Sequence, residues 1–132
     1  MSNDTTDWTE LREFADVDIT QSFALSWQVE AQSLMIDLDL YLNKEHPFYE
    51  APRPAEKACY RPAFLEFPDC TSAIERGNSE ELAVTDAANS FAAGKISGFR
   101  RVGDGRYEVR GDFGTIEIES DRPLLRLKDL SL

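Results

Sequence analysis

Hydrophobic and polar residues alternate with a period of two along two adjacent stretches, residues 22–30 and 33–42. The hydrophobic positions of the second stretch are Leu34, Ile36, Leu38, Leu40 and Leu42, and those of the first are Phe23, Leu25, Trp27 and Val29. Side chains of a β-strand point alternately to its two faces, so both stretches are predicted to be strands with these residues buried. The short link Ala31-Gln32 is expected to join them in an antiparallel hairpin.

Prolines interrupt this pattern after the hairpin. Residues 43–57 contain Pro47, Pro52 and Pro54. They are predicted to form a long ordered loop, because proline lacks a hydrogen-bond donor and restricts the residue before it. A strand is predicted to resume over residues 59–67, where Pro62 indicates a sheet edge or a bulge.

One helix is expected, over residues 79–93. Ser79 is a suitable N-cap, and apolar residues follow it at helical spacing. Gly94 is expected to end the helix.

The remaining residues, 95–127, are predicted to form several short strands. Gly103-Asp104-Gly105 indicates a tight turn with Gly105 in the left-handed region, which places Phe99 opposite Val109 and Arg100 opposite Glu108. A second turn or bulge is expected at residues 111–114, where the buried positions change from odd to even numbers. A third turn is expected at residues 120–123.

These elements predict a mainly β fold, an antiparallel sandwich or open barrel of six to seven strands with one short helix. A chain of 132 residues fits a single domain over residues 1–132. The first 21 residues form either a loosely packed arm or a short helical turn over residues 7–14 capped by Asp7.

The chain carries a net charge of −11 and no long apolar run or signal peptide, which favours the cytoplasm. Residues 94–132 alone are slightly basic, with eight Lys and Arg against seven Asp and Glu. An anionic protein is repelled by nucleic acid and by anionic lipid, so neither is expected as a partner, whereas a basic protein is favoured. The two cysteines, Cys59 and Cys70, are expected to be reduced thiols.

Candidate chemical groups are few. Asp37 and Asp39 lie on one strand face, about 6–7 Å apart, where they could bind a cation, divide acid and base roles, or simply keep the face polar. In a protein-binding domain this acidic face is expected to belong to the interaction surface and to attract a basic partner. His46 is the only histidine and has no partner at metal-ligand spacing, so no metal or other cofactor is expected. No motif supports catalysis, and no catalytic residue is assigned.

Two other groups are candidate binding residues. Arg100, Arg101, Arg106 and Arg110 occur on one hairpin and could hold an anion, although glutamates on adjoining strands could pair with them. The loop region combines aromatic residues with arginine, as interface anchors do. Its candidate residues are His46, Phe48, Tyr49, Arg53, Tyr60 and Arg61.

The segment from Asp18 to Trp27, followed by residues 34–42, resembles the opening of small bacterial β proteins of the YxiG and immunity-protein type. The resemblance implies a metal-free cytoplasmic binder that, like the immunity members of the group, neutralises a toxin, here a basic one. It supplies no functional residue. The sequence therefore predicts a non-catalytic protein-binding domain. The alternative is a small-ligand barrel lined by Trp27, Tyr41, Phe48 and Tyr60, with Arg61 or Arg100 holding an anionic group.

Overall fold

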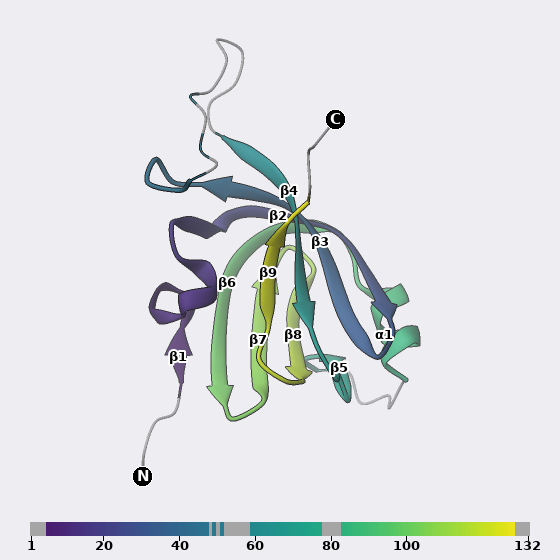
Figure 1. The fold of residues 1–132 in the computed structure, drawn as a ribbon. Coiled ribbons are helices and arrows are strands. Elements are labelled where there is room, and N and C mark those ends of the chain that lie inside the picture. Colours follow the sequence, from purple (N-terminus) through teal and green to yellow (C-terminus); the bar gives the residue numbers. More distant parts are fainter. Residues whose placement is uncertain (1–4, 48, 50, 52–58, 78–82, 129–132) are drawn as a thin grey trace.

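The computed structural model describes residues 5–47, 49, 51, 59–77 and 83–128 of the chain. These residues form one open antiparallel sheet of nine strands with one short α-helix (Figure 1), which confirms the predicted mainly β class. Two very short strands, β1 and β5, account for the number above the expected six to seven. The strands are β1 (Thr6–Asp7), β2 (Val17–Glu30), β3 (Ser33–Leu42), β4 (Tyr60–Phe67), β5 (Ser72–Glu75), β6 (Gly94–Gly103), β7 (Arg106–Gly111), β8 (Gly114–Glu119) and β9 (Leu124–Leu127).

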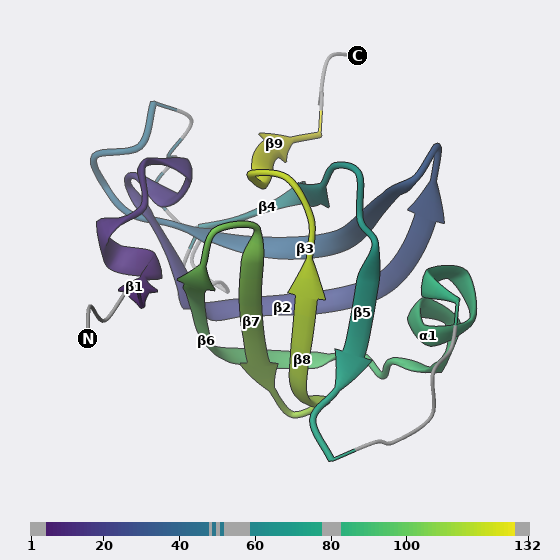
Figure 2. The ribbon, with the colours of Figure 1, turned by 90° about the horizontal axis from the view of Figure 1, so that it is seen from below.

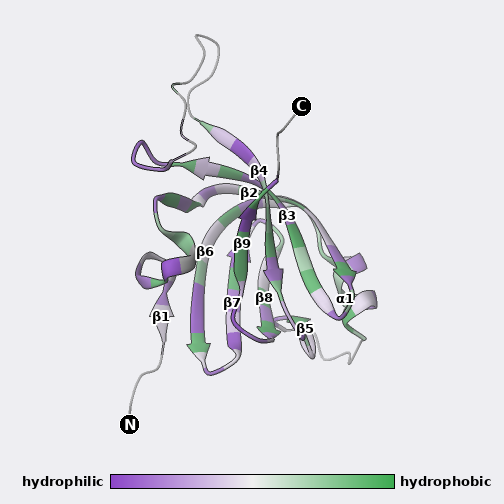
Figure 3. Ribbon diagram, viewed as in Figure 1, coloured by the Kyte–Doolittle hydropathy of each residue, from purple (hydrophilic) through white to green (hydrophobic). Residues whose placement is uncertain are grey.

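The sheet bends so that its two halves face each other across the core. Its strand order is β5-β8-β7-β6-β2-β3-β4-β9, and β1 pairs with β6. Two residue pairs, Phe23–Lys95 and Ala24–Gly94, join the halves between β2 and β6. Figure 2 shows β5, β6, β7 and β8 standing across the layer of β2, β3 and β4. Hydrophobic and polar bands alternate along these strands (Figure 3), and the hydrophobic side chains meet between the halves.

Strand β3 follows the predicted alternation over its whole length. All five predicted inward side chains are at most 1% exposed, and the residues between them are half-buried. The predicted hairpin is also confirmed, because Glu30 pairs with Ser33 across the turn. Ala31 and Gln32 adopt positive φ angles of 50° and 68°, so this two-residue turn has the primed geometry although it lacks glycine.

The predicted phase of β2 is wrong over its middle part. Trp27 is buried as expected, but Leu25 is 53% exposed, and Ala24 is buried in its place. The register with β3 shifts between Asp18 and Phe23 and again between Ala24 and Ser26. The first irregularity adds three residues on β2 and the second adds one. Both are odd numbers, so the side chains beyond each irregularity change faces.

The N-terminal segment contributes side chains to the core. Two short 3₁₀ helices, Trp8–Glu10 and Arg12–Phe14, follow β1. The predicted cap is confirmed, because the Asp7 carboxylate accepts hydrogen bonds from the Thr9 backbone and hydroxyl groups. Phe14 is 3% exposed, and its ring lies 4.9 Å from that of Phe99.

The helix is shorter than predicted. Helix α1 spans Val84–Ser90 and packs against β2 and β5, with Ala83 as its N-cap. The predicted cap, Ser79, lies outside the described residues. Gly94 does not end the helix but begins β6, where an added Cβ would approach the Asp112 Cβ within 2.6 Å. None of the described helices is long and apolar enough to span a membrane.

The C-terminal register agrees with the prediction. Phe99 pairs with Val109 and Arg100 with Glu108, and Gly105 has the expected positive φ of 69°. The change of phase is also confirmed, because Val109 pairs with Ile116 across the turn at residues 112–113. Residues 120–123 form the link to β9.

Strand β4 is internal rather than an edge, and its pairing with β3 has no bulge. Pro62 has no backbone N–H to donate, but no hydrogen bond between β4 and β9 is lost, because the pairing of these strands starts at Ala63. The Pro62 carbonyl accepts from the Lys128 backbone on the β9 side, and a strand residue directs its N–H and C=O to the same side. The missing donor of Pro62 therefore faces the end of the β9 ladder.

Truncation of Leu38 to Ala should lower the free energy of unfolding by about 2–5 kcal/mol, because the side chain is fully buried at the centre of β3. The same truncation at the exposed Leu25 should cost less than about 1 kcal/mol. Urea unfolding of both variants measures the difference. Equal losses would show that the faces assigned to β2 and β3 are wrong.

Candidate binding face

The outer surface of β2, β3, β4 and β9 combines aromatic, aliphatic and acidic side chains. Alternation along β3 places Asp37 and Asp39 here, on the side opposite the core. Directly opposite residues of paired strands share a face, so the register identifies most of the neighbouring side chains. Leu25 has no partner in this register and is included because it is 53% exposed next to the buried Ala24. We call this surface the β3 face. Its members are Phe23, Leu25, Ser26, Met35, Asp37, Asp39, Tyr41, Tyr60, Pro62, Phe64, Glu66, Leu124, Arg126 and Lys128.

A local hydrogen-bond network in β2 places Phe23 on this face. The buried Ser22 hydroxyl donates to the Asp18 carbonyl at 2.8 Å and accepts from the Tyr41 backbone at 2.9 Å. Asp18 in turn accepts from the Thr20 backbone and hydroxyl groups. These bonds satisfy backbone groups where β2 leaves its register with β3, and Phe23 rejoins the ladder opposite Asp39.

The Asp18 carboxylate is stabilised in its charged form. Burial alone would raise its pKa, but hydrogen bonds from Gln21 and Thr20 outweigh this effect, and the net pKa lies below the ordinary value. The acid and hydroxyl residues at the start of the β2–β3 hairpin therefore have a structural role in this chain.

Asp37 has partners within the described residues. Its Oδ2 accepts from the Ser26 hydroxyl at 2.8 Å, and its Oδ1 lies 3.1 Å from the Lys128 ammonium nitrogen. The second contact is an ion pair without hydrogen-bond geometry, because the buried Oδ1 has no hydrogen-bond donor in the described part of the chain. The Lys128 nitrogen also lies 4.6 Å from the centre of the Phe64 ring.

Asp39 is in a different environment. It lies between Phe23 on β2 and Pro62 on β4, and no hydrogen bond or ion pair reaches it from the described residues. Burial raises the pKa of its carboxyl group. Burial also raises the pKa of Tyr60, and the charge of Asp39 adds to that effect. The two aspartates predicted as a pair are therefore not equivalent.

Three aromatic rings form a chain beside Asp39. The Tyr60 ring lies 6.1 Å from that of Phe23 and 5.6 Å from that of Tyr41, measured between centroids. All three side chains are half-buried, so part of each ring is accessible. They come from β2, β3 and β4, and the register of these strands fixes their positions.

The predicted loop residues are only partly described. His46 and Tyr49 are half-buried in consecutive turns, where the Tyr49 backbone donates to the His46 carbonyl at 3.0 Å. Tyr49 packs against the core, so its truncation would affect stability as well as any binding. Arg61 pairs with the buried Leu40 and thus shares the core side of β4, opposite to Asp39. Phe48 and Arg53 lie outside the described residues.

The aromatic residues of the ligand-barrel alternative do not line one cavity. Trp27 is 6% exposed on the core side, and its Nε1 donates to the Ala92 carbonyl at 2.9 Å. Tyr41 and Tyr60 lie on the outer side of the same layer. The fourth residue of that pocket, Phe48, is outside the described residues.

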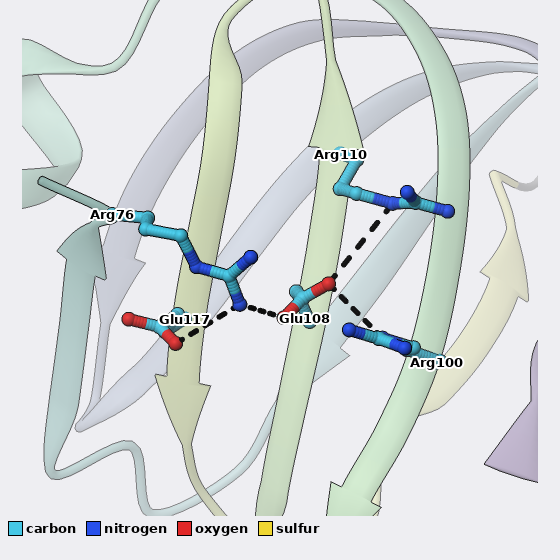
Figure 4. A network of polar contacts seen from close by, with 5 residues as sticks. All are labelled: Arg76, Arg100, Glu108, Arg110 and Glu117. Atoms are coloured by element: carbon cyan, nitrogen blue, oxygen red, sulfur yellow. Dashed lines mark hydrogen bonds and ion pairs between the residues drawn. The ribbon is translucent and has the colours of Figure 1, made fainter. Parts of the chain in front are cut away.

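A second cluster of charges lies on the outer face of β6, β7 and β8 (Figure 4). Glu108 is only 2% exposed because arginine side chains surround it. It accepts from Arg100 Nε at 3.0 Å and from Arg76, and it lies 4.0 Å from Arg110 Nε. Arg76 also donates to Glu117, and this bond and the charge of Glu108 raise the pKa of the guanidinium. The cluster is an internal charge network linking β6, β7, β8 and the end of β5.

The four arginines predicted as an anion site separate in the structure. Arg100 and Arg110 contact Glu108, whereas Arg101 pairs with Tyr107 on the other face of the sheet. Arg106 lies opposite Glu119 at the end of the hairpin. Arg76 joins the cluster without having been predicted, because its position depends on β5, which the sequence pattern did not reveal.

Groups suited to catalysis or metal binding are sparse. Among the described residues, no set of three His, Cys, Asp or Glu side chains is placed to hold a metal ion. Cys59 is buried, and Cys70 is half-buried with its thiol pKa raised by burial. A raised pKa disfavours the reactive thiolate at Cys70.

No family model matches this chain, and no curated protein or solved structure is significantly similar to it.

Replacing Glu108 by Gln should lower the free energy of unfolding by about 1–3 kcal/mol, because three partly exposed guanidinium groups lose their shared counter-ion. Glu117 contacts Arg76 from an exposed position, so Glu117→Gln is a matched control with an expected loss below about 0.5 kcal/mol. Thermal and urea unfolding measure both. A loss at Glu108 no larger than at Glu117 would contradict the role of this network.

The two aspartates of the β3 face should respond differently to the same change at pH 7. Asp37→Asn should cost up to about 1 kcal/mol through the loss of its pair with Lys128. Asp39→Asn should leave stability within about 0.5 kcal/mol of the wild type, or raise it. A carboxyl whose pKa is raised by folding contributes stability at low pH that is lost as the pH rises through the folded pKa. The free energy of unfolding of Asp39→Asn relative to that of the wild type should therefore increase from pH 3 to pH 7. A difference that does not change with pH would contradict this prediction.

Proposed function

We propose that this chain is a cytoplasmic, non-catalytic bacterial domain that binds a basic protein partner on the β3 face. The partner's activity would be blocked by this contact, as in the immunity proteins that the N-terminal hairpin resembles. One observation carries the proposal. The large hydrophobic side chains that are most exposed among the described residues, Leu25 at 53% and Leu124 at 48%, both lie on this face.

The other side chains of the β3 face have the composition of an interface. Aromatic side chains give a large contact area at low entropic cost, and Tyr41 and Tyr60 each have a polar group for hydrogen bonding. Exposed apolar residues that gather on one surface are typical of interaction sites, whereas single ones are not.

The charge of the chain supports a basic partner. A net charge of −11 attracts a cationic protein over several ångströms and accelerates association. The opposite outer face, around Glu108, is less suited to binding, because its acidic and basic groups already pair with one another.

Leu25→Lys tests the proposal, with Asn89→Lys on the exposed surface of α1 as the control for the same added charge. The partner is first isolated with the tagged wild-type domain, and binding of the variants is then measured by biolayer interferometry. Leu25→Lys should weaken binding at least tenfold, about 1.4 kcal/mol, because it replaces an apolar contact by a charge that repels a basic partner. Asn89→Lys should change it less than twofold. Equal effects of the two variants, or association rates insensitive to salt, would reject this face or this partner class.

A further inference from the structure

We propose that Asp39, Phe23 and Tyr60 form an anchor site for one cationic side chain, arginine or lysine, of the basic protein partner. This inference rests on the proposed function and specifies its chemistry. The three residues come from three adjacent strands, β2, β3 and β4. The site is thus set by strand register rather than by a loop.

A similar site, already filled by a lysine of this chain, lies at Asp37, the next outward-facing residue of β3. Lys128 pairs with the Asp37 carboxylate at 3.1 Å and lies 4.6 Å from the centre of the Phe64 ring, directly across from Asp37. A carboxylate on β3 beside an aromatic ring on a neighbouring strand therefore holds an ammonium group in this molecule. Asp39 beside Phe23 repeats this arrangement on the β2 side.

The environment of Asp39 favours a cation supplied from outside the described residues. Its carboxylate is flanked by Phe23 and Pro62, and no described side chain pairs with it. A partly desolvated carboxylate without a partner is unfavourable, and its raised pKa is consistent with this. An incoming cation would remove the penalty, and lower local polarity would strengthen the ion pair.

The aromatic residues add selectivity for the shape of the cation. The faces of Phe and Tyr rings attract cations, and guanidinium groups stack on them better than ammonium groups. The Phe23 and Tyr60 rings lie 6.1 Å apart between centroids and are inclined by 51°, and Phe23 lies directly across from Asp39 in the β2–β3 ladder. A guanidinium group stacked on Phe23 would therefore lie beside the Asp39 carboxylate. We therefore expect arginine to bind more tightly than lysine.

The test uses the peptide Ac-Gly-Arg-Gly-NH₂ as probe, titrated to 100 mM at constant ionic strength and followed by ¹H–¹⁵N NMR. Its neutral control contains citrulline, which has the shape of arginine without the charge. The arginine peptide should shift and saturate the amide signals around residues 23, 39 and 60, whereas the citrulline peptide should not. Asp39→Asn should weaken this binding at least fivefold, while Asp37→Asn, which removes the same charge two residues away, should change it less than twofold.

Several results would overturn the anchor: no shifts at these residues, equal binding of the citrulline peptide, or equal effects of the two substitutions. The failure of the anchor can be separated from that of the proposed function. If Leu25→Lys abolishes partner binding but the arginine peptide does not bind at Asp39, the face binds protein without a cation anchor. If the peptide binds at Asp39 but Leu25→Lys leaves partner binding unchanged, the anchor remains and the proposed interface is wrong.

Discussion

The burial of one face of β3 is the constraint on which the candidate face depends. Five aliphatic side chains of β3 are almost completely inaccessible, and a shift by one residue would move all of them to the outside. The free energy lost by exposing five aliphatic side chains therefore fixes the register of β3 against both β2 and β4. The outward residues Asp37, Asp39 and Tyr41 then have determined neighbours on each side. The outer surface is thus ordered by the same packing that stabilises the core.

Alternation predicted β3 completely but β2 only in part, and the difference has a physical cause. Strand β3 has no irregularity, so a period of two is sufficient to assign its faces. Strand β2 contains two register shifts, and these depend on local bonds such as those of the Ser22 hydroxyl. A single sequence gives little sign of such bonds. The result is the exposure of Leu25, one of the residues on which the functional proposal rests.

In the charge cluster around Glu108, the contacts between residues close in sequence could be predicted, and the contact with a distant residue could not. The register of Arg100 with Glu108 follows from the turn at Gly105, because only a few residues separate the two strands. Gly98 adds a further local condition, since a Cβ there would come within 2.7 Å of the Arg110 guanidinium. The contact of Arg76 with Glu108 spans 32 residues and requires the short strand β5 to pair with β8. No periodic pattern in the sequence marks four residues as such a strand.

Asp37 and Asp39 show how the packing of the strands can give two similar residues different roles. The sequence gives the two residues the same type, face and strand, and nothing in their spacing distinguishes them. The structure distinguishes them through a distant residue, since Lys128 follows the last strand and reaches Asp37. Asp37 is thereby part of the fold's own electrostatics, as Glu108 is on the opposite side. Asp39 has no such partner among the described residues and lies among aromatic groups. A carboxylate without a partner among the described residues gains most from an external cation, and the proposed anchor site is therefore placed at Asp39 rather than at Asp37.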